Sequence, residues 1–102
     1  MRRRRNHFQR DDGVLEISAH YVIETDDKAL IEITSNGYRH GDPSAMQRLA
    51  RGEFVDPSEY YFRTIMHFQT SSAKWLHLNA TTSVAVGQRR PRSVILDVYR
   101  IT

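Results

Sequence analysis

Hydrophobic and polar residues alternate along several stretches of this chain, and the alternation predicts extended strands. In the first stretch, 14–25, one face carries Leu15 and Ile17, and polar residues lie between them. A period of two is the repeat of a β-strand, in which successive side chains point to opposite faces of the sheet. The pattern therefore predicts a long strand with one buried face.

Four further stretches are rich in β-branched and aromatic residues and are predicted to be strands: 29–35, 60–69, 74–86 and 94–101. Asp26-Asp27-Lys28 predicts a tight hairpin between the first two strands, and Asn36-Gly37 is a second turn signal. Five strands in hairpin order favour a mainly β fold, an antiparallel sheet that curls into a barrel.

Two aspartate–proline pairs predict helical turns, because aspartate caps a helix and proline fits its first position. Asp42-Pro43 leads into one short helix over 44–51, which ends at Gly52. Asp56-Pro57 repeats the device directly before the strand 60–69. We expect the single helix to cover one end of the sheet.

The composition indicates one domain of 102 residues and excludes several classes of site. Cysteine is absent, which excludes disulfides and thiolate metal sites. No apolar run is long enough for a membrane span or a signal core, so a cytoplasmic protein with no membrane partner is the default expectation.

The formal charge of +3 depends on the four arginines of Arg2–Arg5, without which the remainder carries −1. We expect residues 1–10 to form a basic, disordered tail and residues 11–102 to form the single barrel domain. Nucleic acid is not expected as a partner, because no nucleic-acid-binding motif accompanies the basic tail.

Most of the candidate ligand-binding residues lie on the strand that follows Asp56-Pro57, and the others lie on two other predicted strands. Arg63 could anchor a carboxylate or a polarised carbonyl, and Tyr61 and Asn79 could donate hydrogen bonds to the same ligand. His67 or His20 could move a proton near neutral pH. The alternatives are that the arginine pairs with a carboxylate on the sheet and that each histidine has a structural or surface role.

Other kinds of site find no support in the sequence. The histidines come from separate strands and lack helical ligand spacing, so no metal is predicted. A nucleophile elbow and a phosphate-binding glycine loop are also missing, and we expect no cofactor. No catalytic residue is assigned, and whether the protein is an enzyme stays open.

From about Asn6 to its C-terminus the chain resembles the uncharacterised family called domain of unknown function 3237. The resemblance rests on Ala19-His20-Tyr21, Thr25-Asp26-Asp27, Gly37 with Arg39-His40-Gly41 and Pro43, Val55-Asp56-Pro57, Glu59 to Thr64, Leu78-Asn79, Val86-Gly87 with Arg89, and Leu96 to Tyr99. It implies a small β-barrel with a central cavity, similar in architecture to the allene oxide cyclase, dirigent and calycin barrels. Lys28 departs from the family pattern, which usually has glycine at that point of the turn.

The resemblance also implies strands upstream of Asn6, where this chain has only Met1–Arg5. We therefore expect an incomplete barrel with exposed sheet edges. Two functional hypotheses follow. The first is a barrel that binds an unidentified small organic ligand, with isomerase- or cyclase-like chemistry by analogy. The second is a non-catalytic binding or assembly module that forms a homo-oligomer through its sheet edges.

Overall fold

A computed structural model describes residues 3–9 and 12–102, and the side chains from residue 12 onward. The strands are β1 (Arg3–Gln9), β2 (Leu15–Glu24), β3 (Leu30–Gly41), β4 (Tyr60–Gln69), β5 (Thr82–Arg89) and β6 (Val94–Arg100). The helical segments are the α-helix α1 (Pro43–Ala50) and the 3-10 helices η1 (Pro57–Glu59) and η2 (Ala73–Ala80). The predicted mainly β, antiparallel fold is confirmed.

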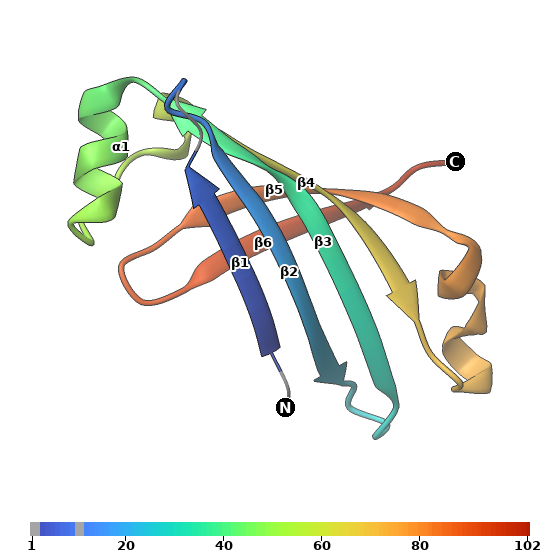
Figure 1. The fold of residues 1–102 in the computed structure, drawn as a ribbon. Coiled ribbons are helices and arrows are strands. Elements are labelled where there is room, and N and C mark those ends of the chain that lie inside the picture. Colours follow the sequence, from blue (N-terminus) through green and yellow to red (C-terminus); the bar gives the residue numbers. More distant parts are fainter. Residues whose placement is uncertain (1–2, 10–11) are drawn as a thin grey trace.

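All six strands form one sheet in the order β1-β2-β3-β4-β5-β6, and each pairs antiparallel with its neighbour in sequence. The sheet is strongly curled, so that β5 and β6 cross behind β1, β2 and β3 in Figure 1. Within the described ranges no ladder joins β6 to β1. The sheet is therefore curled but not closed within these ranges, which agrees with the expectation of an incomplete barrel.

The curl gives the sheet a concave face and an outer face, which alternate along every strand. On β4, Tyr60, Phe62 and Thr64 are buried on the concave face, whereas Tyr61 and Ile65 are exposed on the outer face. The alternation predicted for this strand is confirmed. Because partners in the ladders share a face, the concave face can be followed by register from β2 to β6.

Two hydrophobic clusters fill the concave face, one at each end. The first includes Ala45 and Leu49 of α1 with Leu15, Ile17, Val55, Tyr60 and Phe62. The second includes Ile31, Ile33, Met66 and Ala85, and Trp75 and Leu78 of η2 pack against it. Helix α1 therefore covers one end of the sheet, as predicted, and η2 covers the other.

Both aspartate caps form as predicted. The Asp42 carboxylate accepts a hydrogen bond from the Ser44 backbone N–H at 3.1 Å, and the Asp56 carboxylate accepts one from the Ser58 backbone N–H at 2.9 Å. Gly52 follows α1 with a φ of +82°, the left-handed conformation that glycine adopts without steric cost. The predicted end of the helix is thus confirmed.

Three predictions of local structure are wrong. The segment expected to be a disordered tail contains β1, which pairs with β2 from Arg3↔Tyr21 to Gln9↔Leu15. Asn36-Gly37 is not a turn, because β3 continues through it to Gly41. The strand expected over 74–86 is divided, since η2 occupies its first part and β5 begins only at Thr82.

Gly37 explains why β3 can continue where a turn was expected. An added Cβ atom at this position would lie 1.9 Å from the backbone oxygen of Arg63 on β4. The two strands approach so closely here that only glycine fits. The signal in the sequence was genuine, but it marks a close approach between strands.

Candidate functional site

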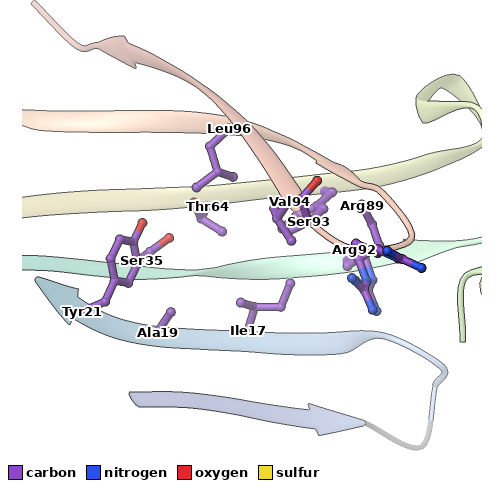
Figure 2. A pocket seen from close by; sticks show the side chains of 12 residues that line it. Ile17, Ala19, Tyr21, Ser35, Thr64, Arg89, Arg92, Ser93, Val94 and Leu96 are labelled. Atoms are coloured by element: carbon purple, nitrogen blue, oxygen red, sulfur yellow. The ribbon is translucent and has the colours of Figure 1, made fainter. Parts of the chain in front are cut away.

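The concave face encloses a cavity of about 540 Å³ between the β2-β3-β4 part of the sheet and the β5–β6 hairpin. Its apolar walls come from both hydrophobic clusters: Ile17, Phe62 and Val94 on the side of α1, and Tyr21 and Leu96 on the other. Figure 2 shows these strands surrounding the space from opposite sides. A volume of this order suits a small organic molecule.

Three arginines lie at the end of the cavity nearest the β5–β6 hairpin: Arg39 from β3, Arg89 from β5 and Arg92 from the hairpin loop. Figure 2 shows Arg89 and Arg92 together at this end, away from Tyr21. No ion pair involves any of the three within the described residues. This end of the cavity is therefore strongly positive.

Arg39 is a partly buried cation. Its guanidinium carbon lies 5.7 Å from the centre of the Phe62 ring, and its Nε atom is buried without a hydrogen-bond partner. Burial lowers the pKa of Arg39, and the positive charge of Arg89 lowers it further. An arginine stays protonated even so, and the lowered pKa reports that its charge is poorly compensated here.

Arg89 is positioned through its backbone. Its N–H donates a hydrogen bond of 2.9 Å to the hydroxyl oxygen of Tyr60, a buried residue at the start of β4. Two residues earlier, Gly87 lies against the Phe62 ring, where an added Cβ would come within 2.8 Å of ring carbons. The close packing of Gly87 on Phe62 brings this end of β5 onto the concave face beside Arg39.

Two hydroxyl groups line the floor of the cavity. Ser35 on β3 is 3% exposed and Thr64 on β4 is 4% exposed. The Thr64 Oγ1 atom is buried and has no hydrogen-bond partner. A buried polar atom without a partner costs free energy.

The residues predicted from the sequence as ligand-binding candidates do not line this cavity. Arg63, Tyr61 and His67 lie on the outer face of β4, as their positions in the alternation require. Arg63 donates a hydrogen bond of 3.0 Å to the Phe62 carbonyl and lies over the Tyr61 ring at 5.2 Å. His67 borders a second, more open hollow of about 510 Å³ on the outer face.

The other two candidates have partners of their own. His20 is on the outer face of β2, where its Nε2 atom lies 2.5 Å from the Glu32 carboxylate on β3. The Asn79 amide bonds to the backbone of Thr70. The five candidates are thus divided between the outer face and η2, and the structure does not bring them together.

Arg39, Arg89, Ser35 and Thr64 were not singled out as site residues from the sequence. A signal for Arg39 was present, because it lies two positions after Gly37 and four after Ser35, on the same face of β3. The assumed turn at Asn36-Gly37 interrupted that alternation. The described residues contain no group of three His, Asp or Glu side chains that could hold a metal ion.

The fold and the cavity together define a small antiparallel β protein whose curled sheet encloses a basic, hydroxyl-lined site. The chain belongs to the family described as "Protein of unknown function (DUF3237)", which matches residues 6–101. The resemblance inferred from the sequence is therefore confirmed.

Two relatives show how much of the chain the family likeness covers. UPF0311 protein CA_C3321 of Clostridium acetobutylicum is 42% identical over 93 residues, which are 91% of this chain and 59% of that protein. UPF0311 protein blr7842 of Bradyrhizobium diazoefficiens is 35% identical over 92 residues, 90% of this chain and 60% of the relative. The chain thus spans about three fifths of the length of these curated relatives.

Solved structures share the fold. A conserved protein of unknown function, RPA1785 from Rhodopseudomonas palustris, matches with a TM-score of 0.92 and 32% identity over 96% of this chain and 66% of that one. A beta-barrel like protein from Acinetobacter baumannii AYE matches with a TM-score of 0.81 and 39% identity over 99% of this chain and 64% of that one. In the described part of the present chain, no helix is long and apolar enough to cross a membrane.

Proposed function

We propose that this protein binds a small organic molecule in the cavity of the concave face. The observation that carries the proposal is the cavity of about 540 Å³, whose lining combines apolar side chains with arginine and hydroxyl-bearing side chains. Binding sites for small molecules are typically concave, mostly apolar and equipped with a few polar groups that orient the ligand. The curled sheet around a cavity also parallels the small β-barrels with a central cavity that the family resemblance implies.

Binding is favoured over isomerase- or cyclase-like chemistry by the residue types at the site. Arginine, serine and threonine side chains line it together with apolar groups. These groups anchor and orient a ligand, whereas proton transfer near pH 7 is most often performed by a histidine or a carboxyl group with a matched pKa. The histidines with described side chains, His20 and His67 among them, are not part of the described lining.

The test uses the neutral fluorescent probe N-phenyl-1-naphthylamine, whose emission rises in an apolar site. We expect saturable binding by the natural sequence and its loss in Ala19→Phe, because Ala19 lines the cavity and a phenyl group would fill part of it. Ser18→Phe is the matched control, since Ser18 is the preceding residue of β2 and is exposed on the outer face. Circular dichroism establishes that both variants are folded.

Retention of probe binding in Ala19→Phe would count against the concave cavity. Loss in Ser18→Phe instead would move the site to the outer hollow, which Ser18 borders. Absence of any saturable fluorescence signal with the natural sequence would refute the proposal.

Assembly through sheet edges is the second candidate function. β1 and β6 end the sheet, and each pairs with a single strand within the described ranges. A terminal strand presents backbone N–H and C=O groups that can pair with another chain. Light scattering after size-exclusion chromatography tests this: a mass that rises with concentration supports assembly, and a constant monomer mass over a hundredfold dilution series excludes it.

A further inference from the structure

The basic end of the cavity indicates the charge of the ligand. Arg39, Arg89 and Arg92 bring three guanidinium groups to one end, and no carboxylate lies within 4.0 Å of them in the described part of the chain. Arg48 pairs with Glu59 at 2.8 Å and Arg51 with Glu53 at 2.7 Å, whereas Arg63, Arg90 and Arg100 have no ion pair in the described part of the chain either. The cavity arginines are therefore distinguished by their meeting at one end of a cavity, three cations together with no carboxylate.

Arg39 and Arg89 are the pair able to hold an anion between them. They come from different strands, yet the charge of Arg89 is close enough to lower the pKa of Arg39. Two guanidinium groups on one site repel each other, and an anion that contacts both converts that repulsion into attraction. Both arginines line the cavity, so their guanidinium groups offer such an anion N–H donors from two strands.

The apolar part of the cavity indicates which kind of chemical group is attached to the anion. Ile17, Ala19, Phe62 and Leu96 supply an apolar wall, and the Thr64 hydroxyl lies buried among them. A free inorganic ion would leave this apolar space unfilled. A ligand with a charged end and an apolar body would use both parts of the cavity.

We propose that the ligand is an organic carboxylate, with its carboxylate group held by Arg39 and Arg89 and its apolar body against Phe62 and Leu96. The planar guanidinium fork can bond to the two oxygens of a carboxylate, and it can bond to a phosphate in the same way. A carboxylate is favoured because its single charge costs less to move from water into a cavity with apolar walls than the two charges of a phosphate monoester. This inference rests on the proposed binding function and adds the chemical class.

The experiment compares 2-naphthoate with its neutral amide, 2-naphthamide, by isothermal titration calorimetry. The two probes share the same ring system and differ in charge. We expect 2-naphthoate to bind on the order of tenfold more tightly. In Arg39→Gln and in Arg89→Gln this preference should fall to within about twofold, because glutamine keeps much of the side chain but carries no charge. The two variants serve as independent tests should one of them fail to fold.

Arg63→Gln is the matched control, since Arg63 is a partly buried arginine of the same sheet on the opposite face. The preference for 2-naphthoate should persist in this variant. Loss of the preference in Arg63→Gln, with retention in both cavity variants, would overturn the inference and place the anion site on the outer face.

The remaining outcomes separate this inference from the function on which it rests. Equal affinity for the two probes in the natural sequence would overturn the carboxylate assignment and leave the binding function intact. Tighter binding of 2-naphthyl phosphate than of 2-naphthoate would replace the carboxylate by a phosphate ester. If neither naphthalene acid derivative binds while N-phenyl-1-naphthylamine does, the charged class is wrong and the cavity remains a binding site.

Discussion

The side-chain amide of Asn79 holds the backbone of Thr70 from both directions. Its Oδ1 atom accepts a hydrogen bond of 2.8 Å from the Thr70 N–H, and its Nδ2 group donates one of 2.9 Å to the Thr70 carbonyl. Thr70 follows β4 directly, and its hydroxyl donates to the Leu30 carbonyl at the start of β3 at 2.7 Å. This chain of contacts fastens η2 to the end of the sheet.

The first prediction follows from that contact. Asn79→Ala should destabilise the fold by about 1–3 kcal/mol, because it leaves two backbone groups of buried Thr70 without partners. Urea unfolding measures the loss. Leu76→Ala, in the same segment but at an exposed position, should cost less than about 1 kcal/mol. Unchanged stability in Asn79→Ala together with lost N-phenyl-1-naphthylamine binding would instead restore Asn79 as a ligand-binding residue.

Gly37→Ala should be among the most damaging single substitutions in the sheet. The added Cβ would meet the Arg63 backbone oxygen at 1.9 Å, and backbone atoms of β4 cannot move aside cheaply. We expect a loss of about 3 kcal/mol or more in the free energy of unfolding, or failure to fold. Its neighbour Asn36 is exposed, so Asn36→Ala should cost below about 1 kcal/mol. Similar losses in the two variants would show that β3 and β4 can separate at this point.

Lys28→Gly should stabilise the protein. Lys28 has a φ of +69°, and among the described residues it is the sole non-glycine in that region. The Cβ of lysine strains this conformation, which glycine adopts freely, so we expect a gain of about 0.5–1 kcal/mol by urea unfolding. Lys28→Ala retains the Cβ and is the control, with a stability close to that of lysine. A gain in Lys28→Ala equal to that in Lys28→Gly would assign the effect to the lost charge.

Asp56 should contribute to stability in a pH-dependent way. Hydrogen bonds from the Ser58 backbone N–H and then from its hydroxyl lower the pKa of Asp56. Because the folded-state pKa lies below the unfolded value of about 3.9, the contribution is full above that value and disappears as the pH falls through the folded-state pKa.

The comparison for Asp56 is Asp56→Asn, which can still cap η1 but does not titrate. The stability advantage of the natural sequence over the variant, measured by urea unfolding, should be larger at pH 6 than at pH 2. An advantage that is constant across this range would contradict the role assigned to the ionised carboxylate.

Much of the fold was predictable where local signals and tertiary packing agree. The alternation over 14–25 and 60–69 marks β2 and β4, because each strand buries one face and exposes the other. The aspartate–proline pairs predicted α1 and η1, since capping depends only on residues a few positions apart. The local sequence of these elements is therefore sufficient to predict them.

The errors occurred where a distant partner decides the local structure. Arg3–Gln9 has the composition of a charged tail, and its extended form depends on pairing with β2. In the same way, Gly37 resembles a turn residue until β4 is placed beside it. The segment 73–80 runs directly into the β-branched residues at the start of β5 and was therefore assigned to the same strand, but Trp75 and Leu78 pack on the second cluster from a helical turn. A stretch of sequence as short as one strand does not show which distant partner it will contact.

The site was harder to predict than the fold for the same reason. Arg63 was selected because aromatic residues surround it in sequence. Its position in the alternation of side chains along β4 puts it on the outer face. Arg39 and Arg89 are fifty residues apart in sequence and meet only because the sheet curls. Candidates chosen by residue type and sequence neighbours, without the curl of the sheet, did not include this pair.

The strict neighbour order of the sheet also has a kinetic consequence. Every ladder from β1 to β6 joins strands that follow each other along the chain, so no pairing has to bypass another strand, although the β3–β4 and β4–β5 ladders close over helical segments. Short separations between contacting residues favour rapid folding among β proteins. The tight link between β2 and β3, closed by a 2.8 Å bond from the Thr25 N–H to the Ala29 carbonyl, makes that hairpin a natural place for the sheet to begin. The cavity would then form last, when the β5–β6 hairpin folds across the strands already in place.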